Sequence, residues 1–170
     1  IFTLQLMWSQ AGPFNQLCRR NENYEVIGFR NFPSDGALMA IGGETVAILE
    51  TRGVASGAKL MNFLNFQLDS TGHYNVPGDV YTAGSYTQIM FPSVYTLKEQ
   101  NNRFVLVGRV DHYVFYENQG FYPDYPSGYL QAVSPTGETI WTVRDSGSYF
   151  ISANLKEEEW IIGAGYSDLV

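Results

Sequence analysis

The sequence predicts an all-β fold built from antiparallel repeats, and three observations support this prediction. Aromatic residues make up 15% of the chain and charged residues only 16%, and aromatic side chains pack well on a pleated surface. Few segments space their apolar residues as a stable helix requires. Short apolar runs instead alternate with turns rich in glycine and proline, as they do in antiparallel β architectures.

The expected elements follow in chain order. Residues 2–8 begin with Phe2, Leu4 and Leu6 at every second position, which is the pattern of a half-buried strand. Residues 13–20 are expected to form a short turn of helix. The other strands are expected at residues 23–30, 37–41, 45–50, 59–68, 79–83, 87–92, 103–110, 112–116, 128–133, 138–143, 148–154 and 159–166.

Turn chemistry separates several of these strands. The pair Gly42-Gly43 favours a tight hairpin, because glycine adopts a positive φ without steric cost. The run from Ser134 to Gly137 contains Pro135, which sets φ at the second position of a turn. The run from Asp69 to Gly72 is expected to form a similar turn, so that His73 lies exposed just after it.

Composition also limits the possible functions. The net charge is −7, and the ten basic residues are spread along the chain. A nucleic-acid groove or an anionic membrane surface requires clustered lysine and arginine, so neither is an expected partner. Cys18 is the only cysteine, which excludes a disulfide within the chain. No spacing typical of a metal or cofactor site is present, and we expect neither.

Three similar sequence segments recur along the chain, each an apolar run that ends at or beside glycine: residues 24–29, 104–109 and 160–165. The first two segments are each followed by a second apolar run with a glycine turn. The interval from Gly28 to Gly43 spans 15 positions, whereas that from Gly108 to Gly137 spans 29. The 14 extra residues are those of the aromatic insertion, residues 113–126. Insertions within repeats usually map to loops on one face, often the binding face.

Residues 128–141, with the turn Ser134-Pro135-Thr136-Gly137 followed by Trp141, resemble a β-propeller blade of the quinoprotein-like or secreted bacterial type. The likeness covers mainly residues 128–168 and extends loosely to residues 24–51. It implies a partial or small β-propeller. The alternative is a β-sandwich or jelly roll, because 170 residues supply only three or four blades, and propellers have at least about four. Either fold is expected as a single domain over residues 1–170, or as a fragment of a larger one.

The aromatic insertion supplies the candidate binding residues. Tyrosine suits recognition because its ring offers apolar area and its hydroxyl a hydrogen bond. The rings are expected to bury against a partner subunit, to stack on sugars, or to form the core of an added hairpin. The candidate binding residues are Tyr113, Tyr116, Phe121, Tyr122, Asp124, Tyr125 and Tyr129.

We therefore expect a non-enzymatic structural or interaction protein, secreted or exposed on the surface of a cell or particle. Its expected partners are other protein subunits, in a homo-oligomer or filament. The alternative is a carbohydrate-binding module or lectin that uses the same tyrosine-rich loop. A glycosidase is a third possibility, with Asp111, Glu117 and Asp124 as its candidate carboxylates. His112 is expected at a surface turn, just after Asp111 ends a strand.

Overall fold

The computed structural model describes residues 1–34, 36–51, 59–116, 120–146, 148–156 and 159–166. These residues form strands and no helix, which confirms the predicted all-β class, and every strand pair is antiparallel. The strands are β1 (Phe2–Ser9), β2 (Gly12–Arg20), β3 (Val26–Phe32), β4 (Gly36–Gly42), β5 (Thr45–Thr51), β6 (Lys59–Leu64), β7 (Ser70–Val76), β8 (Asp79–Ala83), β9 (Tyr86–Glu99), β10 (Phe104–Tyr116), β11 (Gly120–Val133), β12 (Thr139–Ser146), β13 (Ser148–Lys156) and β14 (Glu159–Tyr166).

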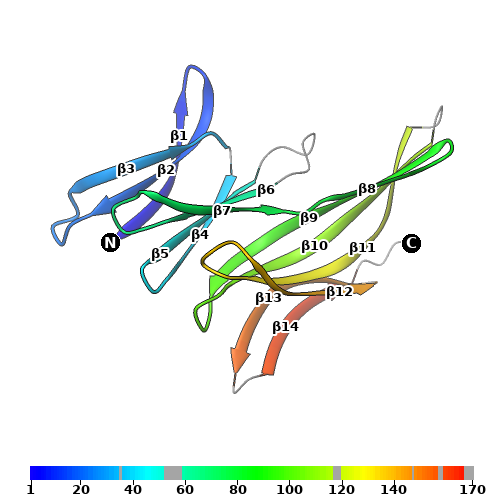
Figure 1. The fold of residues 1–170 in the computed structure, drawn as a ribbon. Helices are drawn as coiled ribbons and strands as arrows, with labels where there is room; N and C mark the ends of the chain where they lie inside the picture. The colour runs from blue at the N-terminus through cyan, green and yellow to red at the C-terminus, as the bar shows by residue number, and fades with distance from the viewer. Residues whose placement is uncertain (35, 52–58, 117–119, 147, 157–158, 167–170) are drawn as a thin grey trace.

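The strands of the described residues form four sheets, which follow one another from the N-terminal to the C-terminal part of the molecule (Figure 1). Sheet 1 contains β1, β2 and β3 in that order, and sheet 2 contains β4, β5, β6 and β7. Sheet 3 has the order β12-β11-β10-β9-β8. Sheet 4 is the hairpin of β13 and β14. Neighbouring strands within each sheet are consecutive in sequence.

Three hydrophobic cores hold successive sheets together. Between sheets 1 and 2 the buried residues are Leu17, Phe32, Val46, Ile48, Leu64 and Leu68. Between sheets 2 and 3 they include Leu49, Met61, Phe63, Leu97, Phe104, Leu106 and Tyr129. Between sheets 3 and 4 they are Val105, Val107, Leu130, Ala132, Phe150 and Ala153. The fold is thus a series of sheets that pack face to face.

Sheet 2 is covered on both faces, and its sequence shows why. Val46 and Ile48 on β5 face sheet 1, whereas Ala47 and Leu49 face sheet 3. All four side chains are fully buried. A strand buried on both faces carries a continuous apolar run instead of an alternating pattern, and the segment Val46-Ala47-Ile48-Leu49 is such a run.

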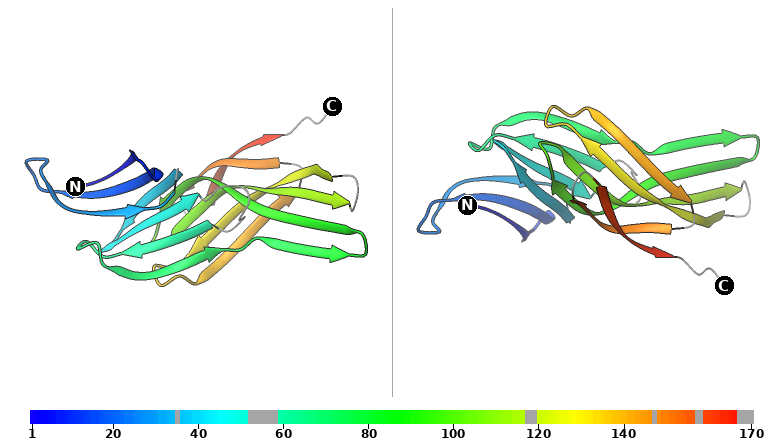
Figure 2. Two further views of the ribbon diagram at one scale, coloured as in Figure 1. Left: turned by 90° about the horizontal axis from the view of Figure 1, so that it is seen from above. Right: turned by 90° about the horizontal axis from the view of Figure 1, so that it is seen from below.

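Sheet 3 is built in two sections that share its three central strands. β12 ends where Ser146 pairs with Ser127, and Ser127 pairs with Val110. β8 begins farther out, where Asp79 pairs with Met90. One section therefore contains β12, β11, β10 and β9, and packs on sheets 2 and 4. The other contains β11, β10, β9 and β8. We call this second section, residues 79–91, 111–116 and 120–126, the arm. It projects beyond the other sheets (Figures 1 and 2).

The expected helical turn at residues 13–20 is wrong, because this segment is strand β2. Its inward face carries Asn15, Leu17 and Arg19, of which only Leu17 is apolar. The Asn15 side-chain amide donates to the Ser34 carbonyl at 2.7 Å, and the Arg19 guanidinium donates to the Phe66 carbonyl at 2.9 Å. Both polar side chains form hydrogen bonds on the inward face. The sequence of β2 therefore lacks the alternation of apolar and polar residues that usually predicts a strand.

Other expectations on local structure also need correction. The strands expected at 103–110 and 112–116 are one strand, β10, so Asp111 and His112 lie within a strand instead of at a turn. The expected turn from Asp69 to Gly72 lies mostly in β7, a strand that the sequence analysis missed. His73 lies on β7, and its side chain is exposed as expected.

Two glycines permit close packing around sheet 3. A Cβ at Gly108 on β10 would collide with the Ser93 backbone carbonyl of β9, at a point where the register between the two strands shifts. A Cβ at Gly128 on β11 would lie 2.7 Å from the Phe150 ring of sheet 4. Gly128 therefore leaves the space that the Phe150 ring fills in the third core.

Candidate functional site

The aromatic insertion predicted as a loop is part of the arm. Its residues extend β10 and β11 into a long hairpin, in which Tyr113 pairs with Pro123 and Val114 with Tyr122. The 14 extra residues of the second repeat are therefore mainly strand. Gly28 lies on β3, at an edge of sheet 1, whereas Gly108 lies on β10 between two neighbours. The resemblance of the repeats to propeller blades stays a prediction.

The arm carries many aromatic residues and few charges. Its segments contain no lysine or arginine. Tyr81 and Tyr86 approach edge-on, with ring centroids 6.2 Å apart, and Phe91 and Tyr113 lie 6.2 Å apart on the opposite face. Such a composition resembles the core of a protein interface, where tyrosine and phenylalanine are enriched and charged residues depleted.

The structure places the seven candidate residues in two different settings. Tyr113 is half-buried on the arm. The backbone of five others also lies on the arm, while their side chains are outside what the structure describes: Tyr116, Phe121, Tyr122, Asp124 and Tyr125. Tyr129 is fully buried in the core between sheets 2 and 3, so it offers no surface to a partner. Glu117, a candidate catalytic carboxylate, lies outside the described residues.

Sequence reasoning missed the other half of the arm. Tyr81 and Phe91 lie on the hairpin of β8 and β9, which packs beside β10. Both strands of this hairpin were predicted, and Gly84 between them is a recognisable turn residue with a φ of 60°. The pairing of β9 with β10 places the aromatic residues of the β8–β9 hairpin beside those of the β10–β11 hairpin. Nothing in the local sequence of either hairpin predicts this pairing.

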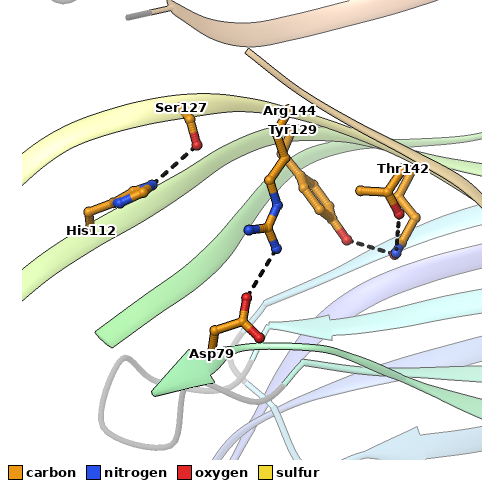
Figure 3. A network of polar contacts seen from close by, with 7 residues as sticks. Asp79, His112, Ser127, Tyr129, Thr142 and Arg144 are labelled. Carbon is orange, nitrogen blue, oxygen red and sulfur yellow. Dashed lines mark hydrogen bonds and ion pairs between the residues drawn. The ribbon is translucent and has the colours of Figure 1, made fainter. Parts of the chain in front are cut away.

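Tyr129 belongs to a polar network centred on the buried Gln131 side chain (Figure 3). Its hydroxyl donates to the Gln131 side-chain oxygen at 2.6 Å. The Tyr74 hydroxyl donates to the same oxygen at 3.1 Å. The Gln131 amide donates to the Thr142 hydroxyl at 3.0 Å. Burial raises the pKa of the Tyr129 hydroxyl above its usual value, and the nearby Tyr74 hydroxyl acts in the same direction. This network joins sheet 2 to sheet 3.

An ion pair links the two edge strands of sheet 3. The Arg144 guanidinium on β12 lies 3.2 Å from the Asp79 carboxylate on β8, although three strands separate β12 from β8 within the sheet (Figure 3). This contact is possible because sheet 3 curls strongly. It lies at the base of the arm, and both side chains are substantially exposed.

His112 lies at the base of the arm, beside a shift in the register between β10 and β11. Its Nε2 atom is 3.2 Å from the hydroxyl of Ser127 (Figure 3). A catalytic serine–histidine pair also needs a third group that orients the histidine ring. Among the described side chains none bonds to the other ring nitrogen of His112. His112 pairs across the strands with Asp124, whose side chain lies outside what the structure describes.

Asp111 is occupied by contacts on the opposite face of β10. One carboxylate oxygen lies 2.5 Å from Arg109 Nε, and the other accepts a hydrogen bond from the Ser93 hydroxyl. Arg109 also lies over the Tyr95 ring, 6.0 Å from its centroid. Burial raises the pKa of the Tyr95 hydroxyl. Both carboxylate oxygens of Asp111 are thus engaged by other groups of the protein.

A surface depression of about 480 Å³ lies at one end of sheets 2 and 3, where three turns meet. Its lining includes the polar side chains of Glu44, Gln67 and Thr136 and the ring of Phe66, and it contains no lysine or arginine. Hydroxyl, amide and carboxylate groups beside an aromatic ring can hydrogen-bond the hydroxyl groups of a polar ligand while the ring packs on its apolar part. Within the described residues, no group of three or more histidine, cysteine or acidic side chains is placed to hold a metal ion.

Comparisons with protein-family models, with curated proteins and with solved structures gave no match to this chain. The described part of the chain also contains no helix long and apolar enough to cross a membrane. The arm combines a high aromatic content with an absence of lysine and arginine. Three of its four strands, β9, β10 and β11, continue into the section of sheet 3 that packs on sheets 2 and 4.

Proposed function

We propose that this chain is a non-enzymatic structural or interaction protein that contacts partner subunits through the arm. The observation that carries the proposal is the arm itself, an aromatic section of sheet 3 that lies beyond the layers covering the rest of that sheet (Figure 2). Association with a partner that covers such a surface lowers the free energy, because apolar area is removed from water. A secreted or surface-exposed location is part of the proposal.

The proposal is tested by substituting one arm residue and one matched residue elsewhere. Tyr81→Ser removes an exposed ring from the arm, and Tyr24→Ser removes an exposed ring from a turn of sheet 1. In sedimentation velocity experiments we expect the native protein to form oligomers at micromolar concentration. Tyr81→Ser is expected to weaken association at least about tenfold, the loss of roughly 1.4 kcal/mol, whereas Tyr24→Ser leaves it unchanged. A native protein that stays monomeric, or equal effects of both substitutions, contradicts the proposal.

Carbohydrate binding is the second candidate function. The depression lined by Glu44, Gln67, Thr136 and Phe66 favours it, as does the tyrosine content of the arm, since a sugar presents both hydroxyl groups and an apolar face. Titration of the ¹⁵N-labelled protein with lactose and cellobiose distinguishes the two locations. Shifts at residues 44–45 and 65–67 would indicate the depression, and shifts at residues 113–126 the arm.

A further inference from the structure

The arm has two strand edges that no other strand of the described residues covers. One is the outer edge of β8, the last strand in the order of sheet 3. The other is the outer edge of residues 120–126 on β11, because β12 pairs with β11 only from Ser127 onward. Uncovered edges present backbone N–H and C=O groups to solvent and can pair with a strand of another chain.

Only the β8 edge is open to such pairing. The free part of β11 carries Pro123 and Pro126, and proline disrupts strand pairing because it lacks a backbone N–H. β8 has the sequence Asp-Val-Tyr-Thr-Ala, with neither proline nor lysine. Every residue of β8 is exposed, and Val80 and Tyr81 are exposed by 67% and 56%. Natural edge strands usually carry a protective residue, and β8 carries only Asp79, whose charge is paired with Arg144.

The hairpin fixes which backbone groups of β8 point outward. Ala83 pairs with Tyr86 across the two-residue turn Gly84-Ser85. Residues that flank a two-residue turn bond to each other, and bonded and non-bonded pairs then alternate along the hairpin. Asp79, Tyr81 and Ala83 therefore bond to β9. The N–H and C=O groups of Val80 and Thr82 point away from the sheet.

We infer that two copies of this chain associate by antiparallel pairing of β8 with β8 about a two-fold axis at Tyr81. This register sets Val80 of each copy opposite Thr82 of the other, so their outward groups form four hydrogen bonds. Asp79 then faces Ala83 of the second copy, and like charges do not meet. Parallel pairing in register would instead oppose the two Asp79 carboxylates, which destabilises a sheet.

A second copy is the partner that fits this edge, because antiparallel self-pairing satisfies two identical open edges at once and closes as a symmetric dimer. The five-stranded sheets of the two copies become one continuous sheet. The inference rests on the proposed function, since it names the partner and the strand through which the arm acts.

Disulfide cross-linking tests the register. In Tyr81→Cys the new cysteines of two copies lie directly opposite each other, with Cα atoms about 4.5 Å apart, which permits a disulfide. In the matched variant Thr82→Cys the two cysteines are offset by two residues along the strands, so their Cα atoms lie about 8 Å apart, beyond the roughly 7 Å limit. Native Cys18 is buried and does not interfere. We expect a covalent dimer from Tyr81→Cys under mild oxidation and none from Thr82→Cys. Equal cross-linking of both variants, or of neither, overturns the inference.

Sedimentation of a charged variant separates this inference from the proposed function. Val80→Lys introduces a protective charge on β8, and Ile161→Lys places the same residue on β14, where Ile161 is 57% exposed. We expect Val80→Lys to weaken dimerisation at least about tenfold and Ile161→Lys to have no effect, with unchanged thermal unfolding in both. An oligomer that persists in Val80→Lys overturns the inference and leaves the proposed function intact. Absence of any oligomer in the native protein overturns both.

Discussion

Tyrosine occurs in two opposite settings in this protein, in the core and on the arm, and Tyr129 illustrates the first. It closes a tyrosine-rich stretch that the sequence marks as a candidate contact surface, yet its ring is fully buried between sheets 2 and 3. Tyr113, at the start of the same stretch, lies on the arm and is half-buried. Local sequence cannot separate the two, because the difference arises from which strands sheet 2 covers.

Replacing Tyr129 with phenylalanine should change the alkaline stability of the protein. The raised pKa of Tyr129 keeps its hydroxyl neutral in the folded state, while the unfolded chain ionises near pH 10. Below pH 10 this difference costs nothing, and above pH 10 it lowers the free energy of unfolding as pH rises, by at most about 1.4 kcal/mol per pH unit.

Urea denaturation of the native protein and Tyr129→Phe at several pH values measures this effect. We expect the variant to be less stable by about 1 kcal/mol at pH 7, because its hydrogen bond to Gln131 is lost. Above pH 10 that difference should shrink, since the variant has no hydroxyl to ionise. Burial also raises the pKa of the Tyr95 hydroxyl and lowers the pKa of the Lys59 ammonium group. Both groups are present in both proteins, so their contributions to the pH dependence of stability cancel. A constant difference from pH 7 to pH 11 would argue against a buried Tyr129.

Gly128 should tolerate no side chain, because the Phe150 ring occupies the space above it. Gly128→Val is expected to lower the free energy of unfolding by roughly 1–3 kcal/mol, the usual cost of overpacking a core. Thermal denaturation measures the loss. Gly84→Asn is the control, since Gly84 has open space around it and asparagine accepts a positive φ. A stable Gly128→Val would mean that sheet 4 does not pack on sheet 3 as described.

At the scale of elements, the strands with strong apolar patterns were predictable. β5 and β8 lie almost where the apolar runs and turns place them. β2 was not predictable, because its inward Asn15 and Arg19 form bonds with residues distant in sequence. Nor was the strand structure of the aromatic insertion, since its extended form depends on the pairing of β10 with β9 and β11. Local propensity therefore located most strands but not their partners.

The ion pair between Asp79 and Arg144 should hold the base of the arm without stabilising the whole protein. Exposed ion pairs contribute at most about 1 kcal/mol, and both side chains are largely exposed. Asp79→Asn is expected to change the midpoint of thermal unfolding little. Amide exchange in β8 should become faster, while exchange in β5, buried on both faces, stays the same. Faster exchange in β5 as well would show that the ion pair stabilises the body of the fold.

At the scale of the whole molecule, the face-to-face packing of the four sheets determines which parts remain exposed to a partner. Sheet 2 is covered on both faces and sheet 3 over the section that contains β12, so these layers form the rigid body of the fold. The arm shares β9, β10 and β11 with that body but extends past it (Figure 1). Because β9, β10 and β11 each begin or end in a hydrophobic core, their exposed ends are held in place. An ordered surface loses little conformational entropy when it associates, which favours a role in assembly.

The central claim, that the chain associates through its arm, is tested most directly by hydrogen exchange of the native protein at low and high concentration. We expect protection to rise with concentration at Val80 and Thr82, whose N–H groups point away from β9, and exchange in sheets 1 and 4 to stay constant. Protection that rises on sheet 1 or sheet 4 while β8 exchanges freely at every concentration would contradict the account.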